Sequence, residues 1–143
     1  MVATRHKYSI LITDDDPGVR EALSEIVGAK GFRPVVATNG EEAIEIVQHE
    51  TVHLALLDYQ MPRLTGLETL QLVRQIHALL PAILITADAT REVMRLALQA
   101  HVFSVVPKPV NPHVILNTVL RALGRAYGAV DDPPPPATGE QTP

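Results

Sequence analysis

Five short runs rich in Val, Ile and Leu alternate with five segments of helical periodicity along the chain. Such alternation is typical of repeated βα units that build a parallel sheet. The predicted strands are Tyr8–Thr13, Pro34–Ala37, Leu54–Leu57, Ala82–Thr86 and Phe103–Val106. The predicted helices begin near Gly18, Gly40, Gly66, Thr90 and Asn111. Because runs such as LALL and AILI are apolar on both faces, helices must cover both sides of the sheet. We therefore expect an α/β fold, a doubly wound three-layer sandwich.

The bulk composition fits one domain and excludes several kinds of site. A chain of 143 residues is long enough for a single core. The net charge of −4 and the scattered Lys and Arg residues argue against direct nucleic-acid binding. Without cysteine there is no disulfide and no thiolate metal site. No apolar stretch is long enough to cross a bilayer or to serve as a signal core. We expect a soluble cytoplasmic protein without membrane insertion.

The composition changes abruptly after Tyr127, where the chain continues as GAVDDPPPPATGEQTP. Consecutive prolines favour extended polyproline geometry, and no apolar pattern remains to pack against a core. We therefore divide the chain into a folded domain, residues 6–127, and a Pro-rich disordered tail or truncated linker, residues 128–143. The sequence leaves open whether an output domain follows.

Charged residues follow three of the predicted strands at the point where each strand ends. Asp14, Asp15 and Asp16 follow the first strand, Asp58 follows the third, and Lys108 follows the fifth. The carboxyl ends of parallel strands meet in one crevice, which is where open α/β sheets place their ligands. These side chains are therefore predicted to converge.

The acidic residues of this crevice favour a bound metal ion. Asp16, followed by proline, is explained as the N-cap of the next helix, but Asp14 and Asp15 are not. Two carboxylates about 4 Å apart repel by roughly 4 kcal/mol at an effective dielectric constant near 20, so Asp14, Asp15 and Asp58 together require a cation. Magnesium suits a site of oxygen ligands. The six histidines show no metal-ligand spacing and are expected to be ordinary surface or strand-edge residues.

Three residues of the crevice suit phosphoryl chemistry, although each also has an ordinary structural explanation. Asp58 belongs to a βα turn, yet its carboxylate could act as a nucleophile and form an aspartyl phosphate. Lys108 could be a surface cation, yet its ammonium group can reach the crevice and bind a phosphoryl oxygen. Thr86 ends the fourth strand and could offer its hydroxyl to another phosphoryl oxygen.

The segments DDDPGVR, LLDYQMPRLTG, ILITA and PKP, in this order, together resemble the receiver domain of two-component response regulators. The resemblance covers roughly residues 6–127. It implies a flavodoxin-like (βα)5 fold with strand order 2-1-3-4-5. It also implies a signalling receiver that catalyses only its own phosphorylation and dephosphorylation, not an enzyme for external substrates.

The resemblance assigns a role to each residue of the crevice. Asp58 would be the phosphoacceptor and a magnesium ligand. Asp15 would bind Mg²⁺ directly, Asp14 largely through water, and Gln60 through its backbone carbonyl. The remaining residues that contact the phosphoryl group would be the switch hydroxyl of Thr86 and the ammonium group of Lys108, the latter before a cis Lys108–Pro109 bond.

The resemblance also implies partners. A sensor histidine kinase or a phosphotransfer protein would donate the phosphoryl group. The face made by the fourth helix, the fifth strand and the fifth helix would then regulate an output partner or domain. Two apolar stripes on the last helix suggest docking or a homodimer. They are Ile115, Val119, Ala122 and Ala126, and Leu116, Leu120, Leu123 and Tyr127.

The fifth strand departs from the family pattern. Val105 stands where the family usually has Tyr or Phe, whose rotamer reports activation. Phe103 is predicted to point to the same side of the strand and to compensate. His101 and Val102 replace a common Gly-Ala pair. The sequence therefore predicts an intact phosphorylation site with altered output coupling.

Three other functions are disfavoured to different degrees. The substitution at Val105 keeps open a receiver-like interaction module that works without phosphorylation. A haloacid-dehalogenase-like phosphatase would need a general acid where this chain has Gln60, and an amide cannot exchange a proton at neutral pH. A Rossmann dehydrogenase would need glycines in the turn that reads TDDDPG.

Overall fold

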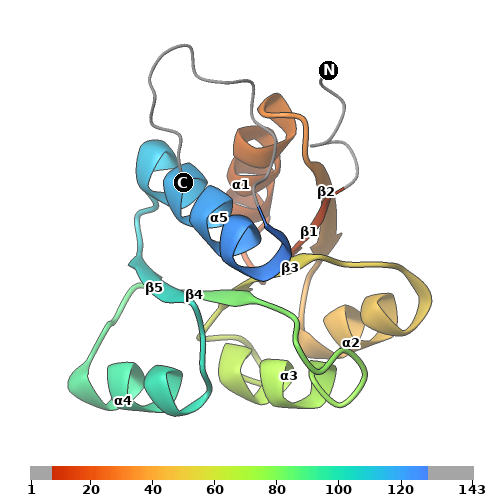
Figure 1. Ribbon diagram of the computed structural model, residues 1–143. Helices are drawn as coiled ribbons and strands as arrows, with labels where there is room; N and C mark the ends of the chain where they lie inside the picture. The colour runs from red at the N-terminus through yellow and green to blue at the C-terminus, as the bar shows by residue number, and fades with distance from the viewer. Residues whose placement is uncertain (1–7, 129–143) are drawn as a thin grey trace.

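A five-stranded parallel sheet lies between two layers of helices in the computed structural model, which describes residues 8–128 (Figure 1). The strands are β1 (Ser9–Thr13), β2 (Arg33–Ala37), β3 (Leu54–Asp58), β4 (Ala82–Thr86) and β5 (Ser104–Pro107). The helices are α1 (Pro17–Ala29), α2 (Gly40–His49), α3 (Gly66–Val73), α4 (Arg91–Gln99) and α5 (Pro112–Tyr127). The strand order β2-β1-β3-β4-β5 confirms the predicted flavodoxin-like fold.

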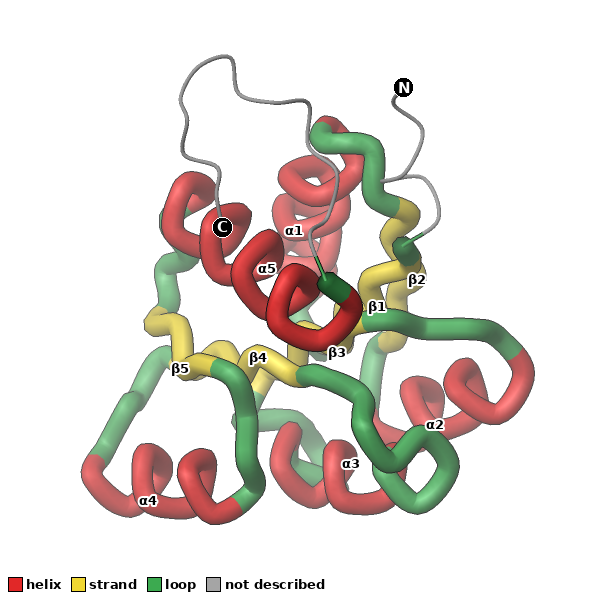
Figure 2. The backbone as a smooth tube through the Cα atoms, in the orientation of Figure 1, coloured by secondary structure: helices red, strands yellow, loops and turns green. Residues whose placement is uncertain are grey.

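The three central strands are buried along their whole length, as their apolar sequences require. Every residue of β1, β3 and β4 is buried, whereas the edge strands β2 and β5 include exposed positions. Helices α1 and α5 cover one face of the sheet, and α2, α3 and α4 cover the other (Figure 2). Neighbouring residues of β1 show this division, because Ile10 and Ile12 pack with α1 and α5 while Leu11 packs with α2 and α3.

Local capping fixes where the helices begin. The Asp16 side chain accepts a hydrogen bond from the Gly18 amide at 2.8 Å, so Asp16 is the N-cap of α1 as predicted. Thr65 and Glu68 form a reciprocal capping box at the start of α3. Thr90 and Asn111 cap α4 and α5, which places both helix starts within one residue of prediction.

The prediction for Phe103 was wrong. Phe103 packs with the core beneath α1 and α5, and the Arg121 guanidinium lies 5.4 Å from its ring centroid. Val105 packs on the opposite face of the sheet, toward α4. The reason is local: Phe103 lies in a bend before β5 begins at Ser104, so strand alternation does not relate the two side chains. Phe103 therefore does not take the place of the aromatic residue that Val105 replaces.

Helix α5 uses most of its two apolar stripes within the domain. The buried residues of these stripes are Ile115, Val119, Ala122 and Leu123. Leu116 and Leu120 are half-buried against the same core, and Tyr127 is exposed. Docking or dimerisation through α5 stays a prediction.

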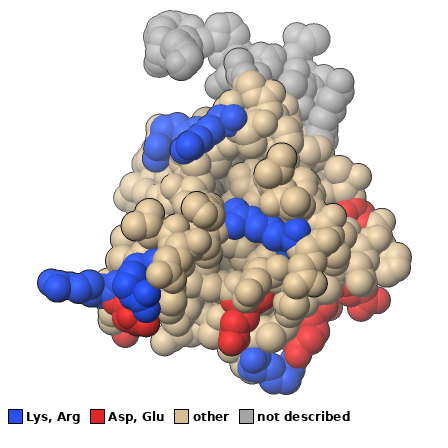
Figure 3. Space-filling model, turned by 60° about the horizontal axis from the view of Figure 1, so that its bottom comes forward, with Lys and Arg blue, Asp and Glu red and all other residues tan. Residues whose placement is uncertain are grey.

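The surface carries charges of both signs. On the face of the described residues that Figure 3 shows, Lys and Arg side chains lie in separate groups, some of them with Asp and Glu beside them. They form no continuous basic area on that face. Across residues 8–128, every helix is too short or too polar to cross a membrane. The predicted Pro-rich tail lies outside the described residues, apart from Gly128.

Candidate functional site

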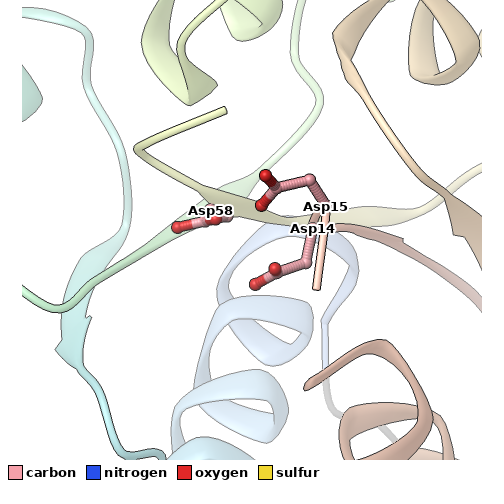
Figure 4. A group of neighbouring side chains, drawn as sticks. All are labelled: Asp14, Asp15 and Asp58. Atoms are coloured by element: carbon pink, nitrogen blue, oxygen red, sulfur yellow. The ribbon is translucent and has the colours of Figure 1, made fainter. Parts of the chain in front are cut away.

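Acidic side chains from two strands meet at one edge of the sheet (Figure 4). Asp14 and Asp15 follow β1, and Asp58 is the last residue of the neighbouring strand β3. Carboxylate oxygens of the three residues lie within 4.8 Å of one another. Asp14 and Asp58 are buried, whereas Asp15 is exposed. The structure thus brings together the three carboxylates that the strand-end pattern predicted to converge.

Lys108 reaches the same crevice from the end of β5. Its Nζ lies 3.0 Å from Asp14 Oδ2 and 3.3 Å from Asp58 Oδ1. The Lys108 amide donates to the Thr86 carbonyl at 2.9 Å, which fixes the backbone beside the end of β4. The Lys108–Pro109 peptide bond is cis, as the family resemblance implied. The ammonium group therefore joins the carboxylates that follow two other strands.

The backbone and one carboxylate oxygen of Asp14 are held from three directions. Its amide donates to the Ala37 carbonyl at 3.2 Å, and its Oδ1 accepts from the Asp16 amide at 2.9 Å. The Arg20 Nη1 donates to the Asp14 carbonyl at 2.8 Å. Oδ2 has no hydrogen bond of good geometry and only the ion pair with Lys108. The second carboxylate oxygen is thus balanced by a single cation, the Lys108 ammonium group.

The turn after Asp58 is shaped by close backbone contacts. A Cβ atom on Gly66 would lie 2.4 Å from the Asp58 carbonyl oxygen, so only glycine fits at this position. The Gly66 amide donates to the Tyr59 carbonyl, and the Tyr59 amide donates to the Ile85 carbonyl. The Gln60 amide approaches Asp58 Oδ1 at 3.4 Å. These contacts fix the path of the backbone just after Asp58 and therefore the position of its carboxylate.

Burial and the neighbouring charges shift the pKa values of Asp58 and Lys108. Burial, together with the Asp14 carboxylate, raises the pKa of Asp58 to about 6, and the Lys108 ammonium group opposes this rise. Burial alone would lower the pKa of Lys108, but its contacts with Asp14 and Asp58 outweigh burial and raise it. Lys108 is therefore a permanent cation at neutral pH.

The donor set fits Mg²⁺. All three acidic residues offer hard oxygen ligands, and Asp14 Oδ2 is a buried anionic oxygen that accepts no hydrogen bond of good geometry and faces only the Lys108 ammonium group. Gln60, whose carbonyl the resemblance assigned to the metal, follows Asp58 closely in the same turn. Thr86 is buried at the end of β4, and its Oγ1 accepts from the Asp88 amide at 3.0 Å. The hydroxyl proton of Thr86 remains available to donate.

Two structural contributions were not predicted from the sequence. No role was predicted for Arg20, because its guanidinium group contacts a backbone carbonyl. Every residue has such a carbonyl, so the sequence does not indicate which one is contacted. Gly66 was predicted only as the start of a helix. The glycine in this turn was the available signal, since a glycine inside a βα turn often marks close approach of backbone.

Comparison with known proteins agrees with this geometry. Residues 10–120 match the sequence profile of the response regulator receiver domain. The chain belongs to the response regulator receiver family. The transcriptional regulatory protein CpxR of Escherichia coli (strain K12) is 32% identical over 118 residues, which are 82% of this chain and 50% of CpxR. The response regulator RR06 of Streptococcus pneumoniae serotype 2 (strain D39 / NCTC 7466) is 30% identical over 87% of this chain and 56% of its own length. The receiver thus spans about half the length of these curated relatives.

Solved structures of receivers show the same fold. The chemotaxis protein CheY4 of Vibrio cholerae superposes with a TM-score of 0.77 and 25% identity, over 80% of this chain and 98% of CheY4. A CheY-like receiver domain protein from Methanospirillum hungatei JF-1 gives a TM-score of 0.79 and 27% identity, over 83% of this chain and 95% of its own. This receiver is therefore similar along nearly its whole described length to receivers that were crystallised as separate chains.

Proposed function

We propose that this receiver accepts a phosphoryl group on Asp58 from a phosphohistidine of a sensor histidine kinase or phosphotransfer protein. The observation that carries the proposal is that Asp58 lies close to two further carboxylates and to the Lys108 ammonium group at the carboxyl ends of the strands. An Asp58 oxygen forms a bond to phosphorus as the bond from phosphorus to the histidine nitrogen breaks. The donor histidine, which carries a proton on its other ring nitrogen, keeps the electron pair of the broken bond and leaves as neutral imidazole.

The residues around Asp58 supply charge and position for this transfer. Asp58 must be ionised to attack, and with a pKa raised to about 6 by burial most of it is ionised at neutral pH. Lys108 lies within ion-pair distance of Asp58. Its ammonium group is therefore close enough to pair with a negatively charged phosphoryl oxygen once the group is bound to Asp58. Thr86 offers its hydroxyl proton to another oxygen.

Asp14, Asp15, Asp58 and the Gln60 carbonyl would hold Mg²⁺ in this site. When bound, Mg²⁺ supplies positive charge to the phosphoryl oxygens during transfer. Without a cation the three carboxylates repel one another, and Lys108 offsets only part of that repulsion. The site thus depends on magnesium for both its electrostatic balance and its chemistry.

We propose that the output signal passes through the face made by α4, β5 and α5. Met94 and Leu98 of α4 are exposed on the surface, with 46% and 76% of their area accessible. Val105, packed toward α4, replaces the aromatic residue that the family usually has there. A phosphorylation-independent interaction module is the second candidate function, and the observation that favours it is this substitution.

The test is the intact mass of the full chain after incubation with Mg²⁺ and a small acyl phosphate. We expect one phosphoryl group per molecule, and none after Asp58→Ala or after chelation of Mg²⁺. The matched control is Asp16→Asn, which changes a neighbouring acid but retains an N-cap for α1. A folded protein that never gains the adduct would support the phosphorylation-independent module. An adduct that persists in Asp58→Ala would place the acceptor elsewhere.

A further inference from the structure

Three aromatic side chains meet at the end of the sheet opposite to the acidic crevice. Tyr8 precedes β1, His53 precedes β3, and Tyr127 is the last residue of α5, whose end lies near the start of these strands (Figure 1). Ring centroids are 5.1 Å apart between Tyr8 and His53, 5.6 Å between the two tyrosines, and 5.5 Å between His53 and Tyr127. The cluster therefore joins three elements that are far apart in the sequence.

The His53 side chain adds a hydrogen bond to those that pair the starts of β1 and β3. The His53 amide donates to the Ser9 carbonyl at 2.9 Å, and the Ser9 amide donates to His53 Nδ1 at 2.9 Å. A backbone amide can donate only to a ring nitrogen that carries no proton. The imidazole is therefore neutral, with its proton on Nε2, because a proton on Nδ1 would face the Ser9 N–H.

The same residue holds the end of α5. The Tyr127 hydroxyl donates to the His53 backbone carbonyl at 2.7 Å. The tyrosine ring also packs edge-on against the imidazole. Tyr127 is followed by Gly128, the C-cap of α5, beyond which the described part of the chain ends. The position of the last turn of α5 thus depends on where His53 lies.

The charges around His53 disfavour its protonated form. Burial lowers the pKa of His53, and the nearby His77 lowers it further. From β2, the Arg33 guanidinium donates to Ser9 Oγ at 3.1 Å and pairs with Glu50 at 3.0 Å. The rings of Tyr8, just before β1, and of Tyr127, from α5, pack against the imidazole. Within residues 8–128, none of the ion pairs brings a carboxylate to the His53 ring.

We propose that His53 is a proton-sensitive clasp that holds the last turn of α5 to β1 and β3 and loosens it in mild acid. Protonation at Nδ1 removes the acceptor of the Ser9 amide and places two N–H groups against each other. The imidazole must then turn away, so the ring contact with Tyr127 is lost and the hydrogen bond from the Tyr127 hydroxyl to the His53 carbonyl is left to hold the two residues together. This device is separate from the acidic crevice and needs no phosphoryl group.

The experiment uses the unphosphorylated full chain and follows amide hydrogen exchange and the Tyr127 ring signals by NMR. Because the closed form disfavours a protonated ring while the opened form gains a proton near the ordinary histidine pKa of about 6.5, we expect the protection factor of the Ser9 amide to fall about ten-fold between about pH 7.5 and about pH 5.5. The Tyr127 ring signals should move toward solvent-exposed values over the same range. Protection factors, rather than exchange rates, remove the intrinsic effect of pH on exchange.

Matched variants separate the clasp from general acid sensitivity. His53→Asn keeps an acceptor near the position of Nδ1 that does not titrate, so Ser9 should stay protected at both pH values. His53→Phe keeps a ring without the acceptor, so protection should be low at both. Tyr127→Phe should leave the pH response of Ser9 intact while loosening α5 at every pH. His77→Asn should retain the response but move it to higher pH, because His77 lowers the pKa of His53.

Three outcomes would overturn the proposal. Ser9 protection and the Tyr127 signals could stay constant while the His53 imidazole titrates. His53→Asn could lose Ser9 protection in acid as the wild type does. The response could also disappear in Asp58→Asn, which would assign the acid sensitivity to the crevice instead of the clasp.

Discussion

The Lys108 ammonium group lies between two buried carboxylates, 3.0 Å from Asp14 Oδ2 and 3.3 Å from Asp58 Oδ1. One cation therefore contacts both the proposed phosphoacceptor and a proposed metal ligand. The Asp14 side chain is only 1% exposed, so water cannot screen it, and Lys108 is its only charged partner in the described part of the chain. Any phosphoryl group on Asp58 would compete with Asp14 for the same ammonium group.

Replacing Lys108 with glutamine should destabilise the metal-free receiver. The change leaves two buried carboxylates without a counter-charge. We expect the free energy of unfolding to fall by about 2 kcal/mol at neutral pH. This is less than the loss for a fully buried ion pair, because Lys108 is partly exposed to water. Urea denaturation measures this loss. Arg125→Gln removes an exposed cation from α5 and should change stability by less than about 0.5 kcal/mol. Equal effects of the two changes would contradict the prediction.

The metal-free receiver should become less stable as pH rises through the titration of Asp58. Burial raises the pKa of Asp58 to about 6 from an ordinary 3.8, so the folded state favours the neutral acid. The resulting stabilisation is complete below the ordinary pKa of 3.8 and is lost as pH rises through about 6. Asp58→Asn should therefore stabilise the metal-free protein at about pH 8 by at most about 3 kcal/mol. The gain should shrink toward about pH 5. Urea denaturation at both pH values gives the comparison, and a gain that is independent of pH would refute it.

Magnesium should stabilise the receiver through Asp15 in particular. We expect millimolar Mg²⁺ to raise the melting temperature, since a ligand that binds only the folded state stabilises it. Asp15 is exposed, so Asp15→Asn should barely change stability without metal yet weaken Mg²⁺ binding more than ten-fold. Thermal denaturation over a Mg²⁺ titration tests both statements. Asp16→Asn is the matched control, and the prediction fails if the two variants bind Mg²⁺ equally well.

Two glycines should respond in opposite ways to the same change. Gly66→Ala places a Cβ atom 2.4 Å from the Asp58 carbonyl oxygen, so the turn must move at a cost of about 2 to 3 kcal/mol. Gly124 lies in α5, and beyond the backbone of its own helix turn no atom lies within 4 Å of an added Cβ. Gly124→Ala should therefore stabilise the receiver by up to about 1 kcal/mol. Chemical denaturation distinguishes the two variants, and a tolerated Gly66→Ala would show that the turn can yield.

The strand ends could be predicted because the residues that form them follow general rules. Buried parallel strands are apolar on both faces, so a charged residue such as Asp58 directly after one marks its end. The N-cap role of Asp16 followed from the same local chemistry. Long-range contacts were not accessible in this way. Arg20 on the Asp14 carbonyl and His53 on the Ser9 amide depend on how separate segments lie in space, and Phe103 was misplaced because the bend before β5 breaks strand alternation.

The buried strand β3 has His53 just before its first residue and Asp58 as its last. Five residues at about 3.3 Å each set the two side chains about 17 Å apart, beyond the reach of electrostatic coupling at physiological ionic strength. The two ends of one strand can therefore change independently. A chimeric regulator could therefore exchange the residues around Asp58 and those around His53 separately. The first exchange would change the phosphoryl chemistry, and the second would change how α5 leads into a following segment.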